Sequence, residues 1–128
     1  MGFYIQSLHN KLYMQINGSE EGAGSSVIVD NFHGKKNQQW KYVNGKIVSK
    51  VSGFVLDLED DDKVILAELK GDASQNWVFD DDLTVANNIG VVLDVRGGSK
   101  TPGAEIIAFK KHGGLNQQFR VVPVNKTN

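Results

Sequence analysis

The chain has 128 residues, of which 40% are hydrophobic and 23% are charged, and its formal net charge is −1. This size and composition predict one soluble globular domain over residues 1–128. Acidic and basic residues are mixed along the chain, and they form no basic stripe of the kind that nucleic-acid binding requires. We therefore expect no nucleic-acid partner. The sequence contains no cysteine, no signal-peptide pattern and no apolar run of membrane-spanning length. These features predict no membrane insertion and a protein that is cytoplasmic or secreted by a non-classical route.

Three similar segments follow one another along the chain, and each contains an apolar run with the alternation of a β-strand. The runs are LYMQI (12–16), FVLDL (54–58) and VVLDV (91–95). Their polar members are 42 residues apart (15 to 57) and 37 residues apart (57 to 94). The segments end in the motifs NQQW (37–40), SQNW (74–77) and NQQF (116–119). The separation of the first and last closing aromatics (40 to 119) equals that of the first and last polar members (15 to 94). This register indicates three copies of one unit, at roughly 3–44, 45–81 and 82–124.

In each copy a second short strand, a polar turn with glycine and a third strand follow this run. We expect the second strands at 27–29, 64–66 and 106–108, and the third strands to start at Trp40, Trp77 and Phe119. A further strand in each period is expected around residues 4–5, 47–48 and 85. No segment has apolar residues at helical spacing for long enough to form a helix. Three copies of about four strands predict an all-β fold, a β-trefoil with a pseudo-threefold internal repeat.

Polar and aromatic positions recur at equivalent places in the three copies. The strand alternation predicts that Gln15, Asp57 and Asp94 face away from the core. The closing aromatics Trp40, Trp77 and Phe119 are predicted to lie in the core. The preceding glutamines, which are Gln38, Gln75 and Gln117, are expected to hold the loop in every copy.

The acid after an apolar run and the threefold QxW motif resemble the ricin-B-type lectins over about Tyr4 to Val124. The third copy, with IIAFKKHGGLNQQF (106–119), is similar to the galactose-binding lectin domains of earthworms. The resemblance implies a non-catalytic β-trefoil that binds galactose or N-acetylgalactosamine in up to three shallow pockets, without cofactor or metal. It implies galactose-containing glycans or glycoconjugates as partners. Useful avidity would then come from a homodimer or from more than one active copy.

The third copy has each type of group that a pyranose needs. A carboxylate accepts two hydroxyl hydrogens, an amide or imidazole donates, and an aromatic ring covers the apolar C–H face. Asp94 would accept from two hydroxyls and Phe109 would stack on the sugar. His112 and Asn116 would donate, and Gln117 would orient Asp94. Gly97, in the turn after Asp94, completes the predicted site, and the alternative for Phe109 is packing at the barrel rim.

The other two copies keep only part of this set. The candidates in the second copy are Asp57, Lys70 and Gln75. Here Ala67 replaces the aromatic, Ser74 replaces the asparagine, and the segment from the acid to the closing aromatic is shorter. The candidates in the first copy are Gln15, His33, Asn37 and Gln38, with Phe32 able to stack from a shifted position. A neutral amide binds a diol less tightly than a carboxylate, so we expect weak binding or none at both places.

Two alternatives remain open from the sequence. One is a glycan-targeting module of a larger enzyme or toxin, and the other is a β-trefoil that has lost sugar binding and acts through protein contacts. We expect no catalysis, because Asp57 and Asp94 occupy equivalent positions of different copies and would be too far apart to act as a glycosidase pair.

Overall fold

The protein, seen here as a computed structural model, is described over residues 2–18, 22–60 and 62–124. Residue 1 and residues 125–128, which end the predicted domain, lie outside the described residues. Twelve strands form the described fold. They are β1 (Phe3–Ser7), β2 (Tyr13–Ile16), β3 (Val27–Asp30), β4 (Trp40–Val43), β5 (Lys46–Ser49), β6 (Val55–Glu59), β7 (Lys63–Ala67), β8 (Trp77–Phe79), β9 (Val85–Asn87), β10 (Val92–Val95), β11 (Ile106–Phe109) and β12 (Phe119–Pro123).

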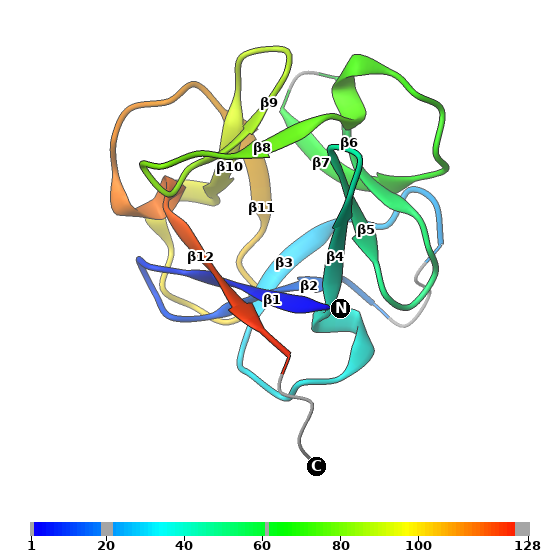
Figure 1. Ribbon diagram of the computed structural model, residues 1–128. Coiled ribbons are helices and arrows are strands. Elements are labelled where there is room, and N and C mark those ends of the chain that lie inside the picture. Colours follow the sequence, from blue (N-terminus) through cyan, green and yellow to red (C-terminus); the bar gives the residue numbers. More distant parts are fainter. Residues whose placement is uncertain (1, 19–21, 61, 125–128) are drawn as a thin grey trace.

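The strands are arranged as three lobes around one axis (Figure 1). Each predicted copy contains four of them, and in each the second and third strands form a hairpin: β2–β3, β6–β7 and β10–β11. The three hairpins touch one another through antiparallel bridges, which are Ser26↔Ile65, Ile28↔Glu105 and Ile107↔Lys63. β1 pairs with β12, so the first and last strands close the structure. The prediction of an all-β trefoil is confirmed.

The core is built from the alternating apolar residues of the repeated strands. Met14, Leu56 and Leu93 occupy equivalent positions and are each fully buried. The closing aromatics Trp40, Trp77 and Phe119 are 0%, 1% and 3% exposed. Each tryptophan N–H finds a carbonyl oxygen inside the core, from Trp40 Nε1 to Met14 O at 3.4 Å and from Trp77 Nε1 to Leu56 O at 3.1 Å. The closing aromatics are therefore core residues, as the sequence predicted.

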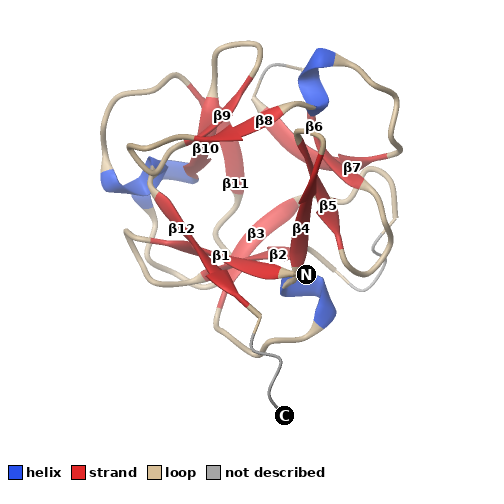
Figure 2. Cartoon of the chain, in the orientation of Figure 1, coloured by secondary structure: helices blue, strands red, loops and turns tan. Residues whose placement is uncertain are grey.

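Four single-turn 3-10 helices interrupt the loops of the described chain. They are η1 (Lys36–Gln38), η2 (Ala73–Gln75), η3 (Arg96–Gly98) and η4 (Leu115–Gln117). Figure 2 shows these turns at the periphery of the three lobes. In the described part of the chain, no helix is long and apolar enough to cross a membrane. The turns η1, η2 and η4 each end on the glutamine that recurs in the three repeats, which is Gln38, Gln75 or Gln117.

Candidate functional site

One buried glutamine anchors the loop in each repeat. Gln38, Gln75 and Gln117 are all fully buried. Their Nε2 groups donate to the polar residue of the preceding hairpin, at 3.0 Å to Gln15 Oε1, 3.0 Å to Asp57 Oδ2 and 2.9 Å to Asp94 Oδ2. Each Nε2 also donates to a loop carbonyl, and each Oε1 accepts from a loop N–H. The glutamine thus ties the loop to the acid or amide beneath it in every copy.

Asp94 is the polar residue of the third repeat and pairs across the hairpin with Ile107. It faces away from the core, but the loop covers it, and only 3% of the residue is exposed. Its Oδ2 accepts from Gln117, and its Oδ1 accepts from Asn116 Nδ2 at 3.2 Å. A carboxylate has about four acceptor positions, so about two remain for a ligand. Burial raises the pKa of the Asp94 carboxyl above its ordinary value of 3.8, against the opposing effect of the Gln117 hydrogen bond.

His112 presents a donor next to this carboxylate. Its Nδ1 accepts a hydrogen bond from the backbone N–H of Gly114 at 3.0 Å, which places the proton of the neutral ring on Nε2. Nε2 lies 3.7 Å from Asp94 Oδ2, beyond a direct hydrogen bond, and the side chain is 43% exposed. The Nε2–H group is therefore available to a ligand that also reaches Asp94.

Phe109 provides an apolar surface at the same edge. It is the last residue of β11 and is 51% exposed, whereas Ile107, two residues earlier on the same side of the strand, is buried. Its ring centroid lies 6.1 Å from that of His112, with the two planes at 65°. The structure thus brings together an exposed ring, an imidazole donor and a carboxylate in the third repeat.

Of the other predicted residues of this site, Asn116 bonds directly to Asp94, whereas Gly97 lies in the turn after β10. Asn116 Nδ2 donates both to Asp94 and to the carbonyl of Val95 at 3.2 Å, so both of its hydrogens are used. The sequence predicted Asn116 as a donor to the sugar, whereas the atom that this arrangement leaves for a ligand is Oδ1. Gly97 lies in η3, the turn after β10, with a φ of 63° that favours glycine. The next residue, Gly98, is hydrogen-bonded through its carbonyl to His9 Nε2 at 2.6 Å, which attaches this turn to the first repeat.

The second repeat keeps the acid but not the surrounding groups. Asp57 is 5% exposed, and its Oδ1 accepts from the backbone N–H of Leu58 at 2.6 Å. Ala67 stands at the place of Phe109 and offers no ring. Lys70, at the place of His112, is exposed. The structure brings Asp57 and Gln75 together, while the stacking surface is missing.

In the first repeat the polar groups bond mainly to one another. Gln15 Oε1 accepts from His33 Nε2 at 3.0 Å as well as from Gln38. His33 has the orientation of His112, since its Nδ1 accepts from the N–H of Lys35 at 3.0 Å, but its donor is already used. Asn37 Oδ1 is buried without a hydrogen-bond partner among the described residues.

Two features of the sites were not predicted from the sequence. A Cβ atom on Gly114 would lie 2.7 Å from His112 Cε1 and 2.8 Å from Asn116 Oδ1, so these side chains occupy the space that a larger residue would need. The available signal was the second glycine of HGG, where the other copies have Lys35 and Asp72. In the first repeat, Phe32 contacts Tyr4 and Tyr13 with ring centroids 5.1 Å and 5.0 Å apart. The tyrosines lie on β1 and β2, and only the cross-strand register reveals this cluster.

The third repeat of this threefold β-trefoil presents a carboxylate, an imidazole donor and an exposed ring. A domain of this class suits a polar ligand that has an apolar face. The chain matches the family model of the ricin-type beta-trefoil lectin domain over residues 1–121. It therefore belongs to the ricin-type β-trefoil lectin family. A search of curated protein sequences finds no match.

Solved structures show the same fold. The designed threefold symmetric protein ThreeFoil is 30% identical, with a TM-score of 0.87, and the match covers 96% of this chain and 99% of that one. The C-half of the earthworm R-type lectin, solved in complex with GalNAc, is 29% identical with a TM-score of 0.84, covering 94% and 97%. An exo-β-1,3-galactanase from Clostridium thermocellum matches at 22% identity and a TM-score of 0.84, covering 96% of this chain and 30% of that one. The family and its lectin members support carbohydrate binding as the general function.

Proposed function

We propose that the protein is a non-catalytic lectin that binds galactose- or N-acetylgalactosamine-type glycans through its third repeat. The observation that carries the proposal is the grouping of Asp94, Phe109 and His112. The carboxylate retains free acceptor positions, the imidazole Nε2 lies 3.7 Å from its Oδ2, and the adjacent ring is half exposed. Vicinal hydroxyls on one side of a pyranose and C–H groups on the other match these three groups. The complex of the similar earthworm lectin with GalNAc supports the choice of sugar.

The affinity of one such site should be low. A single shallow site offers a few charge-assisted hydrogen bonds and one ring contact, against the loss of ligand freedom. A Kd on the order of 10 µM to 1 mM is expected for a monosaccharide or disaccharide.

The absence of a catalytic role is part of the same proposal. Asp57 and Asp94 each lie beneath the loop of their own repeat and each bond to the glutamine of that repeat. Each carboxylate is thus held within its own repeat, whereas the two carboxyl groups of a glycosidase flank one bond of the substrate. The buried position of each supports an orienting and accepting role.

An NMR titration tests the proposal. Lactose and, separately, mannose are added to the wild type, to Asp94→Asn and to the matched variant Asp57→Asn. We expect lactose to shift the resonances of Phe109, His112 and Gly114, and this response to be lost in Asp94→Asn and retained in Asp57→Asn.

A ring variant and the wild-type response itself provide two further tests of the proposal. Phe109→Ala, which alters a half-exposed side chain, should weaken lactose binding while the spectrum stays that of the folded protein. No response to any sugar in the wild type would contradict the proposal and would favour a β-trefoil that acts through protein contacts.

A further inference from the structure

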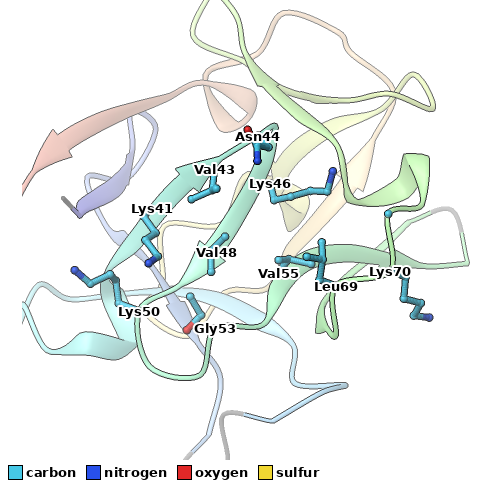
Figure 3. A pocket seen from close by; sticks show the side chains of 12 residues that line it. Lys41, Val43, Asn44, Lys46, Val48, Lys50, Gly53, Val55, Leu69 and Lys70 are labelled. Atoms are coloured by element: carbon cyan, nitrogen blue, oxygen red, sulfur yellow. The ribbon is translucent and has the colours of Figure 1, made fainter.

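A hollow of about 830 Å³ lies where the first repeat meets the second, and its lining does not include Asp94 (Figure 3). It is formed by the outer face of the β4–β5 hairpin, the start of β6 and the loop after β7. The residues that line it are Lys41, Val43, Asn44, Lys46, Val48, Ser49, Lys50, Gly53, Val55, Leu69, Lys70 and Gly71. Its volume is in the range of small-molecule sites.

The floor of the hollow follows from the strand register. One row runs across four strands through the pairs Lys41↔Val48, Val48↔Val55 and Val55↔Ala67. In the third repeat the equivalent row ends in Phe109, paired with Val92. Ala67 is therefore the place where a ring is missing, and the second repeat also has the shortest segment between acid and closing aromatic. The row that includes Val48 and Val55 thus lacks the ring with which the equivalent row of the third repeat ends.

Four lysines surround this floor: Lys41, Lys46, Lys50 and Lys70. Figure 3 shows them around Val43, Val48 and Val55. Among the described residues no acid lines the hollow, and none of the four lysines takes part in an ion pair. Within the described part of the chain, Lys46 alone of the four has a polar side-chain partner, since its Nζ donates to Asn76 Oδ1 at 2.5 Å. The described lining of the hollow is thus net positive, with the amino groups of Lys50 and Lys70 pointing away from the valines (Figure 3).

This cluster of lysines is not repeated around the fold. By ladder register, Lys41, Lys46 and Lys50 correspond to the uncharged Val78, Thr84 and Asn88 where the second repeat meets the third. Where the third repeat meets the first, Arg120 stands at the place of Lys41. The shared fold therefore does not require lysines here. An anion in the hollow would be attracted by this net positive lining.

We propose that this hollow binds an acidic saccharide unit, one that carries a carboxylate or a sulfate ester. The lysines would contact the anionic group, while the valines and Leu69 would contact the C–H face of the ring. The bounded volume fits one or two sugar units, in contrast to a nucleic acid or a membrane surface, which would need an extended basic face. The choice of a saccharide rests on the lectin function proposed above, whereas the choice of an anion rests on the lysines alone.

The test uses the full chain and four probes: lactose, sialyllactose, sulfated lactose and inorganic sulfate. Each is titrated by NMR into the wild type, the double variant Lys41→Gln/Lys50→Gln and a charge-matched control, Lys63→Gln/Lys100→Gln. We expect at least one acidic lactose to shift Val43, Val48, Val55 and Leu69, and lactose to leave them unchanged. The double variant should weaken this response roughly threefold to tenfold, and the control should not. Raising NaCl from about 50 mM to about 300 mM should weaken it too.

The outcomes separate this inference from the proposed function. Lactose shifts at Phe109 and His112 without any response of the hollow to the acidic sugars would overturn the inference alone. A response of the hollow without lactose binding at the third repeat would support the inference and contradict the galactose site. Equal affinity for inorganic sulfate would overturn the saccharide part. Binding to vesicles of anionic phospholipid that requires Lys41 and Lys50, with no response to acidic sugars, would also overturn it.

Discussion

The position of His112 depends on the absence of a side chain at residue 114. A Cβ there would meet both His112 Cε1 and Asn116 Oδ1 well inside van der Waals contact. The φ of Gly114 is −76°, which any residue adopts, so the constraint is space and not backbone strain. Lys35 at the equivalent position of the first repeat shows that the turn itself tolerates a side chain.

Gly114→Ala should therefore weaken sugar binding and leave folding almost unchanged. We expect the displaced His112 and Asn116 to reduce lactose affinity about threefold to tenfold, with a change in unfolding free energy of about 0.5 kcal/mol or less. Isothermal titration and urea denaturation measure the two quantities. A large loss of stability with unchanged affinity would contradict this role for Gly114.

The Asp94 carboxyl predicts the pH dependence of the third-repeat site. Its pKa is raised by burial, and the ionised form is the one that accepts hydroxyl hydrogens. The affinity for lactose should thus be highest well above the raised pKa and should fall as the pH drops through it. This loss should begin at a higher pH than it would for an aspartate with an ordinary pKa. Because the folded state holds this proton more tightly than the unfolded state, protonation of Asp94 does not itself destabilise the fold. Lactose titrations between about pH 7 and pH 4, with far-UV circular dichroism as the folding control, check the prediction.

The residues of the third site were predictable because their types and spacing repeat a pattern in the sequence. Their hydrogen bonds were not. Whether Asn116 donates to a sugar or to Asp94 depends on distances of a few tenths of an ångström, which spacing does not encode. The proton position on His112 likewise depends on a bond to a backbone N–H within the loop.

At the scale of elements, the loop that ends each repeat is held by one glutamine rather than by its own helical turn. The turns η1, η2 and η4 are three residues long and have no side-chain cap. The glutamine side chain makes hydrogen bonds on both its nitrogen and its oxygen in every repeat. The contributions of this glutamine to stability and to sugar binding can therefore be separated by substituting it in different repeats.

Gln75→Ala and Gln117→Ala should destabilise the fold by similar amounts, about 2–4 kcal/mol, because each leaves buried partners without a hydrogen bond. Only Gln117→Ala should also weaken lactose binding, since it frees the Asp94 carboxylate to reorient. Denaturant midpoints at constant m value give the stability, and titration below the transition gives the affinity. Equal loss of affinity in both variants would show that binding is not confined to the third repeat.

The strands were predictable to within one or two residues because alternation and the repeat reinforce each other three times. The hollow between the first and second repeats was not predictable from this pattern. Its floor consists of residues that lie far apart in the sequence and are brought together by the cross-strand pairing of β4, β5, β6 and β7. Its charge comes from lysines that nothing in the sequence distinguishes from ordinary surface residues. Sequence reasoning assigned Lys70 only as a replacement for His112, and the structure places it at the rim of a separate surface.

At the scale of the whole molecule, a threefold fold carries three different surfaces. The hydrophobic core is nearly the same in each repeat, whereas the outward groups have diverged. The third repeat has a carboxylate with an exposed ring, and the first has an amide and a histidine bonded to each other. An apolar floor with lysines lies where the first repeat meets the second. Core positions must pack against their symmetry equivalents, so they vary little. Outward positions lack that constraint, and each can acquire a separate ligand.

This asymmetry predicts the stoichiometry of binding. Isothermal titration with lactose should give about one site per chain, because only the third repeat combines a carboxylate, a free donor and a ring. One weak site per monomer cannot cross-link cells, so agglutination of galactose-bearing cells should require dimerisation of the chain. Analytical ultracentrifugation at the concentrations used for agglutination supplies the comparison. If a monomer agglutinates and lactose inhibits it, a second repeat must bind galactose, and Asp57→Asn and Gln15→Ala in the Asp94→Asn background would identify which one.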